Sequence, residues 1–185
     1  TEDEIIVASS IEEPEVSVQA GRSVRPTQPA GSLLVVATPI GNLEDITFRA
    51  LRALREADLI AAEDTRQTLR LLNHFGIRKP MVSCHDMNEH QKSDDLVRQM
   101  REGRKLVLVS DAGTPGISDP GEWLIRACVA AGLPVSMAPG PAAAIMAVVL
   151  SGLPTERFCF EGFLPAARKD RLRQLESLAG ETRTM

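Results

Sequence analysis

The chain contains no tyrosine and a single tryptophan, so aromatic stacking on nucleobases can play only a small part in its function. Its three cysteines, Cys84, Cys128 and Cys159, are widely spaced, which excludes the spacing of a zinc site and favours reduced thiols in a cytoplasmic protein. No apolar run reaches membrane-spanning length and no signal peptide is recognisable. We therefore expect a cytoplasmic globular protein without a metal centre and without a membrane partner.

Neither sign of charge dominates the part of the chain that we expect to fold. Residues 1–31 carry six acids and two arginines, whereas residues 32–185 carry nineteen acids and nineteen cations. We interpret residues 1–31, which show weak periodicity and three prolines, as a flexible extension or a remnant of expression. The total charge neither predicts nor excludes a nucleic-acid partner, and only a local basic patch can argue for one.

From residue 32 onward, short apolar runs alternate with segments of helical periodicity. The runs that predict strands are 33–37, 59–62, 80–83, 106–110 and 134–138, and the segments that predict helices are 46–57, 65–75, 88–102, 122–131 and 142–150. This alternation predicts an α/β domain over residues 32–152, with a mostly parallel five-stranded sheet flanked by helices. A further strand at 158–160 and a helix at 168–178 predict the beginning of a second α/β domain over residues 153–185, cut short at the end of the chain.

Two polar loops rich in glycine and proline, residues 37–45 and 110–121, follow the first and the fourth predicted strand. Ligands bind at the carboxyl edge of such sheets, so the two loops predict one binding site. Neither the Gly-x-Gly-x-x-Gly signature of dinucleotide folds nor a Gly-x-x-x-x-Gly-Lys loop is present. Glu63 and Asp64 stand where such a fold has its ribose-binding acid, but without the phosphate loop the site suits a ligand whose charge is not phosphate.

Six blocks in this order resemble the ribosomal RNA small subunit methyltransferase I family of the tetrapyrrole methylase superfamily. The blocks are Thr38-Pro39-Ile40-Gly41-Asn42-Leu43, Glu63-Asp64-Thr65-Arg66, His85-Asp86 with Asn88-Glu89, Ser110-Asp111-Ala112-Gly113-Thr114-Pro115, Pro139-Gly140-Pro141 and Glu161-Gly162-Phe163-Leu164-Pro165. The resemblance implies a homodimer of two-domain subunits that bind S-adenosylmethionine between their domains. It also implies methylation of the ribose 2′-oxygen of a cytidine in 16S ribosomal RNA, free or within the small ribosomal subunit.

The resemblance also assigns cofactor contacts to three loops of this chain. They fall on Pro39, Ile40 and Gly41, on Asp111, Ala112, Gly113 and Thr114, and on Ala142 and Ala143. S-adenosylmethionine needs backbone donors and acceptors, apolar walls and no phosphate cradle, and Asp111 could face its positive charge or accept a hydrogen bond from a hydroxyl. The competing interpretation is that Asp111 caps a turn and that the glycines only bend the chain.

Methyl transfer to a sugar hydroxyl gains from a group that accepts the hydroxyl proton. The candidates are His85, Glu63, Asp64 and Glu89, which all follow predicted strands, and His85 has the intrinsic pKa nearest to neutral pH. An alternative role for His85 is to order its loop together with Asn88.

For RNA phosphates the candidates are Arg66 and the basic run Arg168, Lys169, Arg171 and Arg173, unless that run is only a solvated helix face. Trp123 and Phe160 are expected in the core. The nearly uniform apolar segment 141–150 predicts burial against a second domain or subunit. Two alternatives remain: a small-molecule methylase acting on a tetrapyrrole or corrin precursor, and a non-catalytic nucleotide-binding module.

Overall fold

The computed structural model describes residues 31–185, so the predicted extension 1–31 lies outside the described residues except for Gly31. The strands are β1 (Ser32–Val36), β2 (Leu59–Ala62), β3 (Met81–Ser83), β4 (Lys105–Val109) and β5 (Val135–Ala138). They form one sheet in the order β3-β2-β4-β1-β5, and every neighbouring pair is parallel. The predicted five-stranded α/β sheet is therefore confirmed, and the sheet is entirely parallel.

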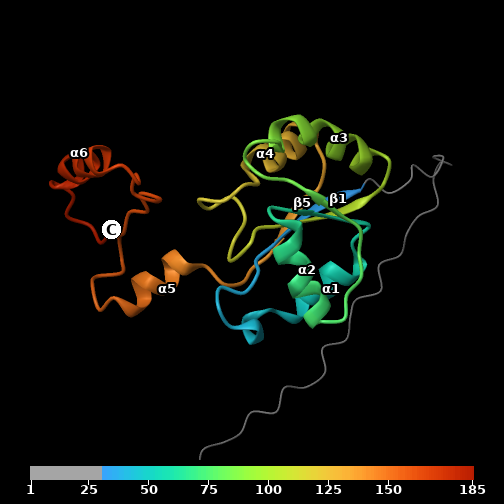
Figure 1. Cartoon of the computed structure of the whole chain (residues 1–185), viewed down its shortest axis with the longest axis horizontal. Helices are drawn as coiled ribbons and strands as arrows, with labels where there is room; N and C mark the ends of the chain where they lie inside the picture. Colours follow the sequence, from blue (N-terminus) through green and yellow to red (C-terminus); the bar gives the residue numbers. More distant parts are fainter. Residues whose placement is uncertain (1–30) are drawn as a thin grey trace, which may run out of the picture.

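Helices cover both faces of this sheet. They are α1 (Phe48–Glu56), α2 (Thr65–His74), α3 (Glu89–Arg101), α4 (Glu122–Ala130), α5 (Ala143–Leu150) and α6 (Arg168–Leu178), with a short 3-10 helix η1 (Leu43–Asp45). Figure 1 shows α1 and α2 on one side of the sheet, α3 and α4 on the other, and α5 and α6 apart from these layers. The chain thus forms a three-layer sandwich followed by a separate C-terminal segment.

Successive side chains along a strand pack into two different hydrophobic clusters, one on each face of the sheet. In β4, Val107 and Val109 belong to the cluster that holds Leu54 of α1, whereas Leu106 and Leu108 belong to the cluster that holds Leu124 of α4. Strands that are buried on both faces must be apolar throughout, which is why the sequence shows runs rather than alternation. The polar residues therefore collect where the strands end.

The start of α4 depends on a carboxylate from α3. Glu89 is only 2% exposed, and its Oε1 accepts a hydrogen bond from the backbone nitrogen of Leu124 at 2.9 Å. The residue before α4, Gly121, has a φ of +130°, and a Cβ at this position would lie 2.9 Å from Cδ2 of Leu108. Glu89 therefore supplies the cap that a glycine cannot offer.

Two expectations for the C-terminal part and the core are wrong. Residues 158–160 form only an isolated bridge, Phe158 to Thr184, in place of a strand. Trp123 is 48% exposed and Phe160 52% exposed, although both were expected in the core. Trp123 lies on the outer face of α4, where its ring meets the ring of His90 edge-on and the guanidinium of Arg126, because the inward positions of α4 are taken by Leu124 and Cys128.

Helix α5 is apolar all round and has no buried residue. Ile145, Met146, Val149 and Leu150 are all among the exposed large apolar side chains, so segment 141–150 is not buried within residues 31–185. No helix in the described part of the chain is long and apolar enough to cross a membrane. The division into domains at residues 152 and 153 stays a prediction.

We expect Glu89→Ala to lower the free energy of unfolding by about 1–3 kcal/mol, because the buried Leu124 N–H loses its acceptor. Urea unfolding of wild type and variant measures this loss. Asp94→Ala, an exposed carboxylate on the same helix, is the matched control and should change the unfolding free energy by less than about 0.5 kcal/mol. Equal changes of the unfolding free energy in the two variants would show that Glu89 does not stabilise α4 as a cap.

Candidate active site

The loops that follow β1 and β4 are tied together by their backbones. Thr38 N donates to Gly113 O at 2.9 Å, and Gly113 N donates to Thr38 O at 3.0 Å. Oγ1 of Thr38 also donates to Ser110 O at 3.3 Å. Gly113 has a φ of +84°, and a Cβ here would stand 3.3 Å from Cγ2 of Ile40, so a side chain at this position would meet the neighbouring loop. This bridge fixes the two loops in which the sequence predicts the cofactor contacts.

A hollow of about 530 Å³, which we call the α5 hollow, lies on one side of the bridge. Six of the nine predicted cofactor residues line it: Ile40, Ala112, Gly113, Thr114, Ala142 and Ala143. Oγ1 of Thr114 donates to Pro141 O at 3.1 Å, which ties the loop after β5 to the other two. Phe158, Phe160 and Phe163 form another wall. The volume lies within the usual range for a small-ligand pocket.

The other three predicted cofactor residues, Pro39, Gly41 and Asp111, line a second cavity of about 430 Å³, which we call the α2 hollow. Gln67 and Arg70 of α2 contribute polar side chains to it. Ile40 and its two chain neighbours thus line different cavities. The structure therefore brings the nine residues to one pair of loops but divides them between two hollows.

Glu63 and Asp111 brace the loops that follow β2 and β4. Asp111 N donates to Oε2 of Glu63 at 3.1 Å, while Asp64 N donates to Oδ1 of Asp111 at 3.0 Å. Each carboxylate therefore accepts a backbone N–H from the opposite loop. The side chain of Asp111 does not cap a turn of its own loop, as the competing interpretation held, but joins two strand ends.

Several carboxylates gather at this edge and disfavour each other's ionisation. Burial raises the pKa of Glu63, and the nearby charges of Asp111, Asp119 and Asp86 raise it further against the lowering effect of the Asp111 N–H. Burial likewise raises the pKa of Asp119, with Asp111 and Asp86 adding to the rise. The edge therefore holds carboxylates that are readier than usual to carry a proton.

Asp119 is a site residue that the sequence reasoning did not select. It lines the α5 hollow, and the only signal for it is that it is the second carboxylate of loop 110–121. The hydroxyl of Ser110 lowers the pKa of Asp119 somewhat, yet Oγ of Ser110 is not in hydrogen-bond geometry with any group of residues 31–185. A buried hydroxyl beside a carboxylate is a suitable partner for a polar ligand atom.

Asp64 is a helix cap rather than a free carboxylate. It accepts hydrogen bonds from Arg66 N at 2.8 Å and from Nη2 of Arg66 at 2.9 Å. The Arg66 side chain holds the pKa of Asp64 at about 2, so Asp64 is a weak proton acceptor. Arg66 remains 86% exposed on its side chain and can still meet a solvent-borne partner.

His85 is engaged with Asn88. Oδ1 of Asn88 accepts from His85 N at 2.9 Å, and Nδ2 of Asn88 lies 3.4 Å from Ser83 O and 3.1 Å from Nε2 of His85. This orientation of the amide makes Nδ2 the donor to Nε2, so the lone pair of the neutral imidazole is occupied and Nδ1 carries the proton. The contacts favour the loop-ordering role over proton acceptance.

The remaining predicted site residues lie elsewhere. Glu89 is buried between α3 and α4, where it caps α4 and faces neither hollow. Arg168, Lys169, Arg171 and Arg173 lie on α6, which Figure 1 shows well apart from the sheet edge. In α6, Arg173 pairs with Asp170, and Nη1 of Arg171 donates to Ala166 O.

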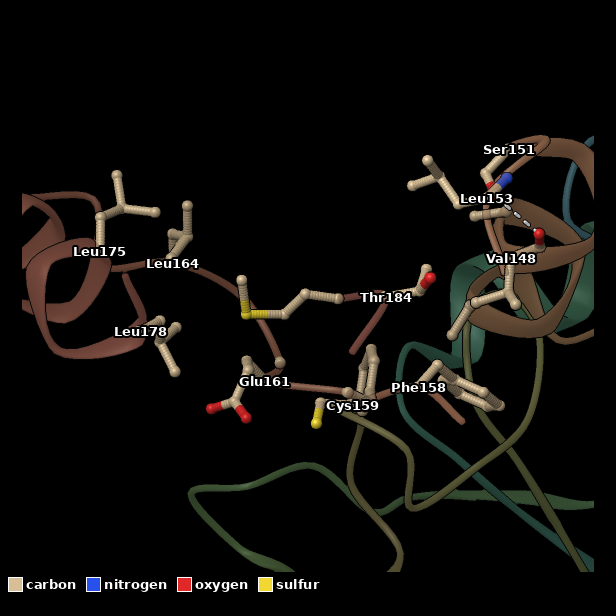
Figure 2. A pocket seen from close by; sticks show the side chains of 15 residues that line it. Val148, Ser151, Leu153, Phe158, Cys159, Glu161, Leu164, Leu175, Leu178 and Thr184 are labelled. Atoms are coloured by element: carbon tan, nitrogen blue, oxygen red, sulfur yellow. Dashed lines mark hydrogen bonds between the residues drawn. The ribbon is translucent and has the colours of Figure 1, made fainter. Parts of the chain in front are cut away.

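A third cavity of about 470 Å³ lies between α5 and α6. Figure 2 shows Leu175 and Leu178 of α6 on one side of it, Val148 and Leu153 on the other, and the thiol of Cys159 near Glu161. Burial raises the pKa of Cys159, whose Sγ lies 3.5 Å from Oε2 of Glu181. A protonated thiol among leucines offers no reactive group, so we place the candidate active site at the bridge.

Solved structures share this fold. The chain superimposes with a TM-score of 0.50 on uroporphyrin-III-C-methyltransferase from Thermus thermophilus, at 25% identity over 68% of this chain and 54% of that one. It superimposes with a TM-score of 0.54 on diphthine synthase, at 22% identity over 69% of this chain and 52% of that one. The second likeness, at lower identity, concerns the fold alone.

Curated relatives are more similar in sequence. Proteins named ribosomal RNA small subunit methyltransferase I from Pasteurella multocida and Escherichia coli O157:H7 are each 54% identical over 84% of this chain, which spans 55% and 54% of their lengths. The protein of that name from Thermotoga maritima is 50% identical over 84% of this chain, and the matched part covers 69% of its length. The chain thus spans about half the length of most of these relatives. The model of the Tetrapyrrole (Corrin/Porphyrin) Methylases matches residues 32–185, and the chain belongs to this family.

Proposed function

We propose that this chain is part of an S-adenosylmethionine-dependent methyltransferase that acts on the ribose 2′-hydroxyl of a cytidine in 16S ribosomal RNA. The observation that carries the proposal is the 50–54% identity to proteins named ribosomal RNA small subunit methyltransferase I over 84% of the chain. The nucleotide and the 2′-oxygen follow from the six motifs that resemble this family. A ribosomal substrate also fits a cytoplasmic location.

The α5 hollow has the properties that S-adenosylmethionine requires. Gly113 and Thr114 line it, its phenylalanines provide an apolar wall, and Asp119 offers a carboxylate to a cation or a hydroxyl. When bound there, the cofactor would supply an electrophilic methyl group. Ile40, Ala112, Ala142 and Ala143 would contact it in the α5 hollow, while Pro39, Gly41 and Asp111 would support it from the other side of the bridge.

Among the four candidate proton acceptors, the structure favours Glu63. The lone pair of His85 is occupied by Asn88, Asp64 has a pKa near 2, and Glu89 is buried elsewhere. Only Oε2 of Glu63 has a hydrogen-bond partner within residues 31–185, and the raised pKa strengthens this group as a base. Glu63 would take the proton from the acceptor hydroxyl through Oε1.

The RNA is expected to meet exposed cations. We propose Arg66, beside the edge of the site, as one contact with a phosphate. Arg168, Lys169, Arg171 and Arg173 of α6 would form a more distant contact. We further propose a homodimer, because the exposed apolar face of α5 needs a cover and a second copy of the protein can supply it.

The proposal is tested by offering the protein two acceptors with labelled S-adenosylmethionine. We expect label in 16S rRNA or in the small ribosomal subunit, at the 2′-oxygen of one cytidine, and none in uroporphyrinogen. Label in the tetrapyrrole would favour the small-molecule methylase, to whose solved relative the chain has 25% identity. Cofactor binding without transfer to either acceptor would favour a binding module.

Gly113→Val should weaken S-adenosylmethionine binding at least tenfold by calorimetry, because the branched side chain would enter the wall shared with Ile40. Gly132→Val is the matched control. Gly132 also has a left-handed φ, +67°, but a Cβ there meets nothing within 4 Å, so this variant bears the backbone strain without touching the hollow. Asp111→Ala should also weaken binding, by releasing the brace to the β2 loop. Unchanged affinity in folded Gly113→Val would show that the cofactor does not bind in the α5 hollow.

Glu63→Gln should lower the turnover number on the order of a hundredfold while the brace persists, since the amide oxygen can still accept from Asp111 N. The wild-type rate should rise as pH increases through the pKa of Glu63, which is raised above 4.5, because only the carboxylate accepts a proton. The variant should lack this limb of the pH profile. His85→Ala is the comparison and should lower the turnover number less than about tenfold. A larger loss in His85→Ala than in Glu63→Gln would make His85 the proton acceptor.

A further inference from the structure

The two helical layers of the sheet differ sharply in charge. Helices α1 and α2 together contain five arginines and one glutamate, a net charge of +4. Helices α3 and α4 contain four lysines and arginines and four acids, a net charge of zero. Helix α6 carries four cations and two acids, a net charge of +2, so the α1–α2 layer holds the largest positive charge among these helices although residues 32–185 as a whole are neutral. We call Arg49, Arg52, Arg55, Arg66 and Arg70 the basic face.

These arginines point away from the core. Ala50, Ala53 and Leu54 are the buried residues of α1, so Arg49, Arg52 and Arg55 follow each other on its opposite, exposed side. Arg66 and Arg70 are likewise exposed and stand one turn apart on α2, whose buried residues are Thr68 and Leu72. Figure 1 shows α1 and α2 on the same side of the sheet, and their buried residues share one hydrophobic cluster, so the exposed arginines of both helices belong to one layer of the protein.

The basic face is poor in partners of its own. Within residues 31–185, Arg49, Arg52, Arg55 and Arg70 have no carboxylate within 4.0 Å, and only Arg66 is paired, with Asp64. On the opposite layer, Arg98 and Arg126 each pair with an acid of their own helix. Nη1 of Arg70 donates to Oε1 of Gln67 at 3.0 Å, a neutral partner. Guanidinium groups without an ion-pair partner on a structured surface can form charge-assisted hydrogen bonds with an anionic partner.

The basic face leads into the candidate active site. Arg70 and Gln67 line the α2 hollow, whose opposite wall is the loop with Pro39 and Gly41, next to the bridge. At the beginning of α1 the ring of Phe48 is 93% exposed, directly before Arg49. A row of cations with an exposed aromatic ring beside it is the chemistry that binds the backbone and an unpaired base of RNA.

We propose that the basic face is the surface on which the protein holds its RNA, with arginines on successive phosphates, Phe48 against an unpaired base and Arg70 at the entrance to the α2 hollow. This inference rests on the proposed function. It gives the main RNA contact to the layer beside the site rather than to α6, the densest basic run of the sequence.

The test compares three double variants that each remove two cations from an exposed helix side. Arg49→Ala with Arg52→Ala alters the basic face, Arg98→Ala with Arg101→Ala is the matched control on α3, and Arg168→Ala with Lys169→Ala alters α6. Affinity for a 16S rRNA fragment is measured from 50 to 200 mM salt. We expect the basic-face variant to bind roughly 25-fold more weakly near 0.1 M salt and its log–log salt slope to flatten by about 1.4, the value for two lost contacts with a single strand. The α3 variant should bind as wild type.

The outcomes separate this inference from the proposed function. If the wild type methylates 16S rRNA but the basic-face variant keeps its affinity and salt slope, the inference alone is wrong. Equal losses in the basic-face and α3 variants would show that only total charge matters, and a loss confined to the α6 variant would place the RNA on α6; both overturn it. Unchanged RNA binding with weaker binding to the whole ribosomal subunit would give the basic face to a protein partner. A wild type without RNA binding or methyl transfer would refute the proposed function itself.

Discussion

The common direction of the five strands is the constraint on which the site depends. In a parallel sheet all strands end at the same edge, and the order β3-β2-β4-β1-β5 places β1 beside β4 and β4 beside β2 at its centre. Loops that are distant in the chain therefore meet there. Thr38 can bond to Gly113, and Glu63 to Asp111, only because their strands are neighbours. Much of the chemistry described above follows from this adjacency.

The carboxylates at this edge accept hydrogen bonds from backbone N–H groups of the loops. Asp111 and Glu63 each accept an N–H from the opposite loop, and Asp64 satisfies the first turn of α2. Loop ends carry N–H groups that no strand partner can satisfy, and side-chain oxygens are the nearest acceptors. Burial raises the pKa of Glu63 and the neighbouring carboxylates add to the rise, whereas the Asp111 N–H of the brace lowers it. Under the proposed function, burial at this edge thus prepares Glu63 as the proton acceptor.

The sequence predicts the central strands well because β2 and β4 are buried on both faces and their sequences are continuous apolar runs, whereas the edge strands β3 and β5 are only partly buried. It predicts the cofactor loops as a group, but the division of Ile40 from Pro39 and Gly41 between two hollows depends on side-chain direction, which spacing does not reveal. In the sequence Glu89 is indistinguishable from any other acid after a strand. Its hydrogen-bond partner, the backbone N–H of Leu124, lies on a different helix, so the capping role is not visible in the sequence. Phe158 shows the opposite failure: its β propensity is present, but within residues 31–185 it forms only an isolated bridge to Thr184 and no strand.

Apart from Arg66, which the sequence predicts as an RNA contact, the arginines of the basic face are not predictable from the sequence, for a related reason. Arg49, Arg52 and Arg55 are separated by apolar residues in the sequence, so no run of charge marks them, whereas Arg168 to Arg173 form a visible cluster. A helix gathers residues three apart onto one side, and the sheet then places two such helices in one layer. Charge asymmetry between layers is thus a property of the fold, even in a segment whose charges sum to zero.

The bridge between Thr38 and Gly113 has a thermodynamic consequence. It forms a wall of the α5 hollow on one side and of the α2 hollow on the other, so the occupants of the two cavities share a structural element. Any displacement of the bridge that favours one occupant alters the fit of the other. With the proposed cofactor in the α5 hollow and the proposed RNA at the α2 hollow, linkage requires the effect to be reciprocal: the factor by which cofactor changes the affinity for RNA equals the factor by which RNA changes the affinity for cofactor.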